Sequence, residues 1–185
     1  MLFRSQAPRS RQYGDVYFSS ENGLAESKAV FLTGCNLPQA WQGRSHFVVA
    51  ELGFGTGLNI LALIRLWLYH RPPGGQLHIF TIEAHPLSRD QARQALTAWP
   101  ELTDLSEALL SRWPVLARGF HHIDLADFGV SIDLAFMEVL DALNAWDGKA
   151  DAWFLDGFSP ATNPQMWRQE VLDQIAFHKI GRAHV

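Results

Sequence analysis

Residues 51–59 combine glycines and polar side chains at a spacing that suits the binding of a polar ligand. Three glycines recur at alternate positions, with Glu51 two residues before the first and Asn59 two residues after the last. An apolar run predicts a buried strand over 47–52, and a helix is predicted over 58–69. Glycines at such a junction let the backbone turn tightly and approach a ligand. The predicted ligand contacts are Glu51, Gly53, Phe54, Gly55, Gly57 and Asn59.

The glycine spacing favours one class of ligand. A dinucleotide site usually reads GxGxxG, whereas glycines at alternate positions after an acid are typical of adenosylmethionine-dependent methyltransferases. The carboxylate of Glu51 suits a cofactor whose methionine end carries an ammonium and a sulfonium. A nicotinamide site and a tight turn without any ligand stay open as alternatives.

Two further acids follow predicted strands and suit a nucleoside. Glu83 ends a strand predicted over 77–83 and lies 26 residues after Gly57, where nucleotide-binding sheets place an acid that accepts hydrogen bonds from ribose hydroxyls. Glu138 follows a strand predicted over 130–136, where it could accept a hydrogen bond from an adenine amino group. Taken alone, the first would be a solvated acid at a strand end and the second an ordinary acid at a helix N-terminus.

A fourth predicted strand, over 151–155, ends in the loop that starts with Asp156. Loops at the carboxyl edge of such a sheet bind ligands, so this loop is expected to face a transferable methyl group. Amine methylation needs a free nitrogen lone pair, and a carboxylate can hold and orient the amine as its proton leaves. We predict Asp156 as the catalytic residue, Phe158 as a stacking partner for a planar base and Pro160 as a residue that stiffens the loop. An Asp-Gly turn beside a buried Phe is the alternative.

Composition restricts the class of protein. The chain has 185 residues, of which 48% are hydrophobic and 18% charged, so a single soluble globular unit is expected. No apolar run is long enough for a membrane helix. The single Cys35 cannot form an internal disulfide, and the sequence has no Cys/His cluster that would predict a structural zinc site. These features fit a reducing cytoplasm. The net charge of −4 predicts no broad basic surface for nucleic acid.

Apolar runs alternate with helical patterns along the chain, which predicts an α/β fold with a doubly wound, mostly parallel sheet. Further strands are expected over 120–125 and 130–136, joined as a hairpin. The remaining helices are expected over 22–34, 88–98, 101–113, 139–145 and 167–177. The carboxyl ends of the parallel strands would bring the glycine segment and the acids to one edge of the sheet.

The two ends of the chain differ from the rest. Residues 179–185 read KIGRAHV and interrupt a helical pattern, and residues 1–5 read MLFRS. Both strings resemble translated sequencing-adapter DNA, so we predict native sequence over 6–178, a partial domain that lacks its C-terminal strands. A genuine short protein is the alternative. A sheet cut in this way would expose apolar surface, and the fragment is expected to be poorly soluble or inactive.

Several segments resemble one known family. The matching strings are DVYFS at 15–19, NGL at 22–24, ELGFGTGLN at 51–59, DAWFLDGFSP at 151–160, NP at 163–164 and MW at 166–167. Together they resemble the methyltransferase domain of the bacterial bifunctional tRNA 5-methylaminomethyl-2-thiouridine biosynthesis proteins, over about residues 12–177.

The resemblance implies a Rossmann-like class I methyltransferase that uses S-adenosyl-L-methionine to methylate the 5-aminomethyl group on the wobble uridine of tRNA. It implies that Gly53, Gly55 and Gly57 cradle the cofactor, that Glu83 holds its ribose, and that Asp156 and Phe158 lie at the substrate amine and base. It also implies an FAD-dependent oxidoreductase domain elsewhere in the parent protein. The negative net charge is a departure from what a tRNA substrate favours.

Three other functions stay open. An aminopropyltransferase would use a related sulfonium cofactor and accept polyamines without tRNA. A nicotinamide-dependent oxidoreductase would bind nicotinamide in place of adenosylmethionine. A non-catalytic nucleotide-binding module would bind the cofactor and transfer no methyl group.

Overall fold

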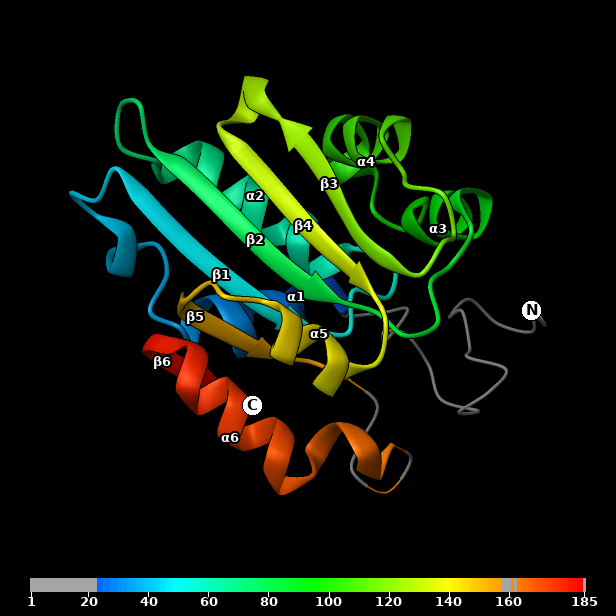
Figure 1. Cartoon of the computed structure of the whole chain (residues 1–185). Coiled ribbons are helices and arrows are strands. Elements are labelled where there is room, and N and C mark those ends of the chain that lie inside the picture. The colour runs from blue at the N-terminus through cyan, green and yellow to red at the C-terminus, as the bar shows by residue number, and fades with distance from the viewer. Residues whose placement is uncertain (1–22, 158–160, 162, 185) are drawn as a thin grey trace.

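A six-stranded sheet forms the centre of the protein, in a computed structural model that describes residues 23–157, 161 and 163–184 (Figure 1). The strand order is β3-β4-β2-β1-β5-β6. The strands are β1 (His46–Leu52), β2 (Gln76–Ile82), β3 (Gly119–Leu125), β4 (Val130–Phe136), β5 (Ala150–Leu155) and β6 (Lys179–His184). Among the strands of the described residues, only β3 runs antiparallel to its neighbour, as the first arm of a hairpin with β4. The predicted α/β class and the predicted hairpin are confirmed.

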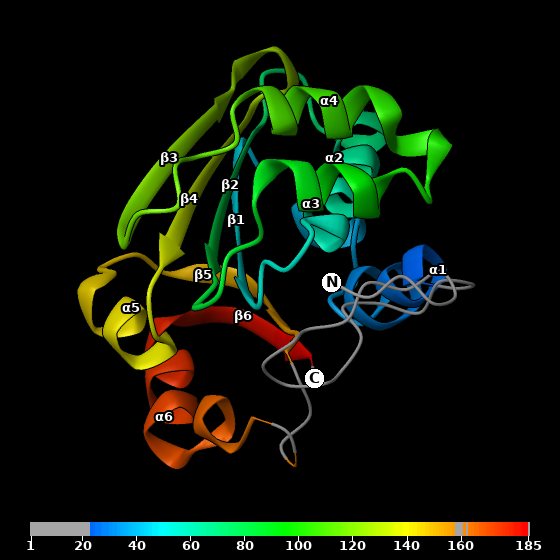
Figure 2. The same cartoon turned by 90° about the vertical axis from the view of Figure 1, so that its right-hand side faces the viewer.

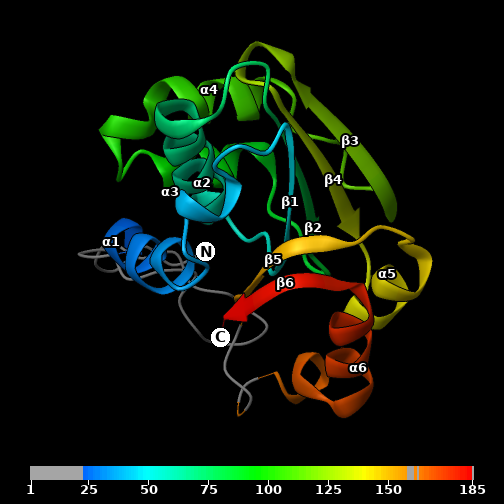
Figure 3. The ribbon, with the colours of Figure 1, turned by 90° about the vertical axis from the view of Figure 1, so that its left-hand side faces the viewer.

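Helices cover both faces of the sheet, as Figures 2 and 3 show. On one face lie α2 (Leu58–His70), α3 (Arg89–Leu96) and α4 (Thr103–Ser111). On the other face lie α5 (Val139–Ala145) and α6 (Gln169–His178). Each face has its own apolar core, because alternate residues of a strand point to opposite sides. The short α1 (Gly23–Ser27) packs against α2.

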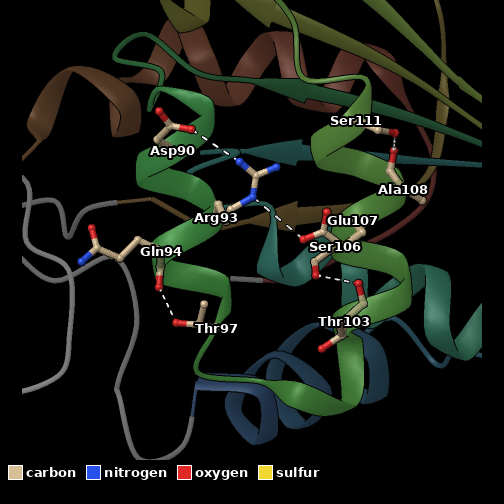
Figure 4. A network of polar contacts seen from close by, with 9 residues as sticks. All are labelled: Asp90, Arg93, Gln94, Thr97, Thr103, Ser106, Glu107, Ala108 and Ser111. Atoms are coloured by element: carbon tan, nitrogen blue, oxygen red, sulfur yellow. Dashed lines mark hydrogen bonds and ion pairs between the residues drawn. The ribbon is translucent and has the colours of Figure 1, made fainter.

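Local sequence fixes where the crossover helices α3 and α4 begin and how they meet. Ser88 caps α3, since its hydroxyl accepts a hydrogen bond from the backbone of Gln91 at 3.3 Å while the Gln91 side chain accepts one from the Ser88 backbone at 2.9 Å. Arg93 then lies between Asp90 of its own helix and Glu107 of α4, at 3.5 and 3.9 Å (Figure 4). These charges are exposed, so burial of the apolar helix faces contributes most of the stability.

Several predicted elements differ in their limits from those in the structure. The helix expected over 22–34 is α1 followed by a π-helical turn over Lys28–Thr33. The helix expected over 101–113 is a 3₁₀ turn over Pro100–Leu102 followed by α4, because proline starts the turn. The helix expected over 167–177 begins at Gln169, after a 3₁₀ turn over Pro164–Trp167.

The structure also adds a strand that the sequence analysis did not expect. Residues Lys179–His184 form β6 and run parallel to β5, with an irregularity in register between Ala150 and Ala152. Backbone amides and carbonyls on the outer edge of β5 need partners, and any extended segment of suitable length can supply them. Side-chain pattern was therefore a poor guide to this strand.

The order β2-β1-β5 decides which residues meet at the carboxyl edge. Leu52, the last residue of β1, pairs with Ile82 at the end of β2 and with Leu155 at the end of β5. The next residue of each strand therefore emerges beside the other two. Among the described residues, no helix is long and apolar enough to cross a membrane.

Candidate active site

The glycine segment leaves β1 as a loop with left-handed backbone. Gly53, Gly55 and Gly57 have φ angles of 89°, 52° and 83°, which residues with a side chain rarely adopt. The backbone N–H groups of Gly53 and Phe54 both donate to the carbonyl of Ile82 at 3.0 Å. A Cβ on Gly53 would lie 2.7 Å from the carbonyl oxygen of Asp156, so only glycine fits between β1 and the loop after β5.

Glu83 ties the end of β2 to this loop. One oxygen of its carboxylate accepts a hydrogen bond from the Gly55 backbone at 2.9 Å, and the other accepts one from the His85 backbone at 2.8 Å. Burial raises the pKa of Glu83, while the two backbone hydrogen bonds and the nearby His85 act in the opposite direction. The carboxylate therefore holds the glycine loop in place from the neighbouring strand.

The side-chain amide of Asn59 forms hydrogen bonds with both Glu51 and Asp156. The side-chain nitrogen of Asn59, in the first turn of α2, donates to Glu51 at 3.1 Å and to Asp156 at 2.6 Å. The second oxygen of Glu51 accepts from the Thr81 hydroxyl at 2.7 Å, and the Asn59 carbonyl accepts from the Ser27 hydroxyl. Side chains from β1, β2, α1, α2 and the loop after β5 thus form one hydrogen-bond network.

Burial governs the protonation of the two bridged acids. The pKa of Glu51 is raised to about 8, first by burial and then by repulsion from Asp156 and Glu83, against the hydrogen bonds from Thr81 and Asn59. The pKa of Asp156 is raised to about 6, mainly by burial, with Glu26 adding repulsion and Asn59 opposing it. Near neutral pH the bridged pair therefore carries one negative charge, on Asp156.

This burial predicts that the protein loses stability as pH rises. The ordinary pKa of a glutamate is 4.5, so above that pH Glu51 loses its proton in the unfolded chain. In the folded protein, where its pKa is about 8, it keeps the proton up to about pH 8. The unfolded state then binds fewer protons, so the free energy of unfolding falls between these two pH values. Asp156 and Glu83, whose pKa values are also raised, act with the same sign. Urea unfolding measured across this range should show the decline.

The matched variants are Glu51→Gln and Glu170→Gln, the second on the exposed surface of α6. We expect Glu51→Gln to gain stability relative to the wild-type protein as pH rises, because the amide has no proton to lose. Glu170→Gln should follow the wild-type curve. Parallel curves for wild type and Glu51→Gln would show that the buried carboxyl is already ionised at low pH.

The structure brings most of the predicted residues together. Glu51, Gly53, Gly55, Asn59, Glu83 and Asp156 are connected by the contacts described above. Phe54 differs, because its side chain is buried against Trp113 with ring centroids 5.2 Å apart, which leaves only its backbone at the loop. Phe158 and Pro160 lie outside the described residues.

Glu138 lines a separate hollow at the same edge of the sheet. The cavity has a volume of about 240 Å³ and is lined by Ala84, Pro86, Leu116, Ala117, Arg118, Phe136, Met137 and Glu138. Ala84, the residue after Glu83, is part of this lining, whereas Glu83 itself is not.

Sequence reasoning missed two members of the network, Thr81 and Ser27. Thr81 is a polar residue in an otherwise apolar strand end and lies opposite Glu51 in the register of β1 and β2. That isolated polar position was the available signal. Ser27 offered none, because its place depends on how α1 packs on α2. Within the described part of the chain, no group of three or more His, Cys, Asp or Glu side chains could hold a metal ion.

Comparison with known proteins adds independent information. A family model described as S-adenosyl-L-methionine-dependent methyltransferase matches residues 100–182. The tRNA 5-methylaminomethyl-2-thiouridine biosynthesis bifunctional protein MnmC of Caulobacter sp. (strain K31) is 63% identical over 174 residues, which cover 91% of this chain and 29% of that protein. This chain is similar in sequence to the MnmC proteins. MnmC of Caulobacter vibrioides is 64% identical over 165 residues, covering 89% of this chain and 28% of that protein.

The similarity to the MnmC proteins covers only part of their length. The chain spans about 29% of the length of the curated MnmC relatives it matches. The solved structure of MNMC2 from Aquifex aeolicus superimposes with a TM-score of 0.73 and 24% identity, over 95% of this chain and 54% of that one. This likeness shows the fold, so the predicted Rossmann-like architecture is confirmed. The matches to the MnmC proteins and to the methyltransferase family model confirm the predicted resemblance.

Proposed function

We propose that the chain is a methyltransferase domain that uses S-adenosyl-L-methionine to methylate the 5-aminomethyl group on the wobble 2-thiouridine of tRNA, giving 5-methylaminomethyl-2-thiouridine. One observation carries this proposal: the glycine loop, Glu83 and Asp156 meet at the carboxyl ends of three adjacent parallel strands. Open α/β sheets bind their ligands at this edge. The names of the MnmC relatives and the matching methyltransferase family supply the reaction class.

The residues at this edge fit the cofactor. The three left-handed glycines of the loop have no side chains, and the side chains of Phe54 and Thr56 between them are buried. The close approach of Gly53 to Asp156 places the glycine loop and the acid side by side. Each carboxylate oxygen of Glu83 accepts one backbone hydrogen bond and keeps a lone pair for a ribose hydroxyl. The proposed cofactor contacts are Glu51, Gly53, Phe54, Gly55, Gly57, Asn59, Glu83 and Glu138. When bound, S-adenosyl-L-methionine supplies the methyl group.

The structure suggests how three of these residues would contribute. Phe54 would contribute its backbone, since its ring is buried in the core. Glu51 would contribute by supporting the glycine loop from its buried side, because it is only 1% exposed and both of its oxygens already accept hydrogen bonds. Glu138 would border adenine in the hollow next to Glu83.

Asp156 is proposed to hold the substrate amine. With a pKa of about 6 it is ionised at neutral pH and can accept a hydrogen bond from the aminomethyl ammonium. Once a proton of that nitrogen has passed to water, Asp156 would orient the nitrogen lone pair toward the methyl group that bound S-adenosyl-L-methionine would supply. We also propose that Phe158 stacks on the uracil base and that Pro160 stiffens the loop.

The setting of this domain is part of the same proposal. The relatives are named bifunctional and are more than three times the length of the chain, which supports a fused FAD-dependent oxidoreductase in the parent protein. Residues 6–178 as the native part of the chain, and a cytoplasmic location, remain predictions.

The test is calorimetric titration of S-adenosyl-L-methionine, with Glu83→Gln beside the surface control Glu170→Gln. Replacing one carboxylate oxygen with an NH₂ group removes one charge-assisted acceptor, so we expect Glu83→Gln to weaken binding about tenfold to hundredfold. Glu170→Gln should bind like the wild-type protein. No binding by a wild-type protein that circular dichroism shows to be folded would refute the cofactor assignment.

A further inference from the structure

One side chain in the site has no role in the assignments above beyond a general cofactor contact. Asn59 places both N–H groups of a single amide on two different carboxylates, Glu51 at 3.1 Å and Asp156 at 2.6 Å. Its own carbonyl accepts a hydrogen bond from Ser27 of α1, which fixes which end of the amide faces the acids. All three polar positions of the amide are therefore used.

The structure of α2 does not by itself require an amide at this position. Asn59 is the second residue of a helix whose neighbouring residues Leu58, Ile60 and Leu61 are buried and apolar. Asparagine is a weak helix former in this position and is favoured instead at the residue before the helix. The hydrogen bonds to the two carboxylates give a reason for its presence that helix formation does not.

The charges around Asp156 show what the amide opposes. Glu51 from β1, Glu83 from the end of β2 and Glu26 from α1 are the acids that act on this network. Burial is the main factor that disfavours a negative charge on Asp156, and Glu26 adds repulsion to it. The donated hydrogen bond from Asn59 favours the charged carboxylate and holds one of its two oxygens in a fixed place.

We propose that Asn59 is a positioning residue, which through its bridge between Glu51 and Asp156 keeps the Asp156 carboxylate ionised and oriented for the substrate amine. This inference rests on the proposed function of Asp156 and deepens it. Ser27 supports the same arrangement by orienting the amide. The oxygen of Asp156 that does not accept from Asn59 is then the one that receives the substrate nitrogen.

The protonation of Asp156 can be measured in the chain without cofactor or tRNA. The protein is labelled with ¹³C-carboxyl aspartate, and the Asp156 signal is assigned by its loss in Asp156→Asn. In Asn59→Leu, we expect the midpoint of the Asp156 titration to rise by about one pH unit, because the donated hydrogen bond is lost. Asn59→Asp should raise it further, since it adds a third carboxylate in place of the donor. Ser27→Ala, a milder change, should raise it less.

Asn144→Asp, on the exposed surface of α5, controls for an added charge on a helix and should leave the midpoint at the wild-type value. A purely structural role for Asn59 would disturb the packing of α2 without moving the titration. The proposal would be overturned if those of the variants Asn59→Leu, Asn59→Asp and Ser27→Ala that remain folded all titrate Asp156 at the wild-type midpoint. Ser27→Ala is the mildest of these substitutions.

Methyl transfer to tRNA carrying the 5-aminomethyl group then separates this inference from the proposed function. We expect Asn59→Leu to lower kcat about tenfold or more, with a smaller change in the KM for tRNA. If the wild-type protein transfers no methyl group while the titration shifts as described, the proposed function fails and the role of Asn59 in the network stands. If the wild-type protein is active and Asn59→Leu has the same kcat, the positioning role fails.

Discussion

Asp156→Asn is expected to lower methyl transfer by at least about a hundredfold while S-adenosyl-L-methionine still binds. Asparagine keeps the size of the side chain and one carbonyl oxygen, but it carries no charge to hold an ammonium. With its oxygen accepting from Asn59, as the aspartate oxygen does at 2.6 Å, its NH₂ group would face the substrate ammonium, to which it offers no acceptor. Single-turnover transfer of a labelled methyl group to undermodified tRNA measures the loss directly.

A matched control lies at the other end of the same strand. Asp151 is buried at the start of β5, where it pairs with Arg44 at 2.8 Å and accepts a hydrogen bond from the Val48 backbone. Asp151→Asn should lower stability and leave the transfer rate of the folded protein unchanged. Equal loss of transfer in both variants would show that Asp156 contributes only to folding.

The same assignment predicts a pH dependence for the wild-type protein. Because burial raises the pKa of Asp156 to about 6, the carboxylate becomes protonated as pH falls through that value. The transfer rate should therefore fall below about pH 6, and Asp156→Asn should lack this acidic limb. An acidic limb that persists in the variant would assign the titration to another group.

Gly53→Ala is expected to abolish cofactor binding and to destabilise the fold by about 3 kcal/mol or more, from backbone strain together with a steric collision. The glycine has a φ angle of 89°, and an added Cβ would lie 2.7 Å from the backbone oxygen of Asp156. A backbone atom of a loop anchored to β5 cannot move aside as a flexible side chain can. The substitution would therefore displace the glycine loop and the loop after β5 together.

Gly74→Ala separates the two causes. Gly74 has a similar φ angle of 70°, but a Cβ there would meet nothing within 4 Å. This control should lose only about 1 kcal/mol from backbone strain and should bind the cofactor normally. Thermal unfolding and calorimetric titration measure both effects. If the two alanine variants behave alike, the close packing of Gly53 against Asp156 has no functional importance.

Local sequence was enough to locate the parts of the site that depend on backbone conformation. The alternate glycines after Glu51 predicted a tight turn between a strand and a helix, and the structure places left-handed glycines there. The acids at the ends of predicted strands were found in the same way, since the order of elements in an α/β sheet sends their carboxyl ends to one edge.

Residue spacing alone was less reliable where an element depends on its neighbours. The helix limits shifted at prolines and at short 3₁₀ turns, and β6 formed where the edge of β5 offered unpaired backbone groups. Phe54 was predicted as a ligand contact, and the structure shows its ring packed against Trp113 of the segment after α4.

The sequence by itself determined the fold class, the glycine loop and the acids at the strand ends, because these follow from hydrophobic periodicity and from the conformational freedom of glycine. Only the tertiary structure decided which of these side chains touch. Asn59 and Asp156 are 97 residues apart, and their hydrogen bond depends on the register of β1 with β5 and on the rotation of α2. Burial, which sets the protonation of Glu51 and Asp156, likewise exists only once the layers have packed.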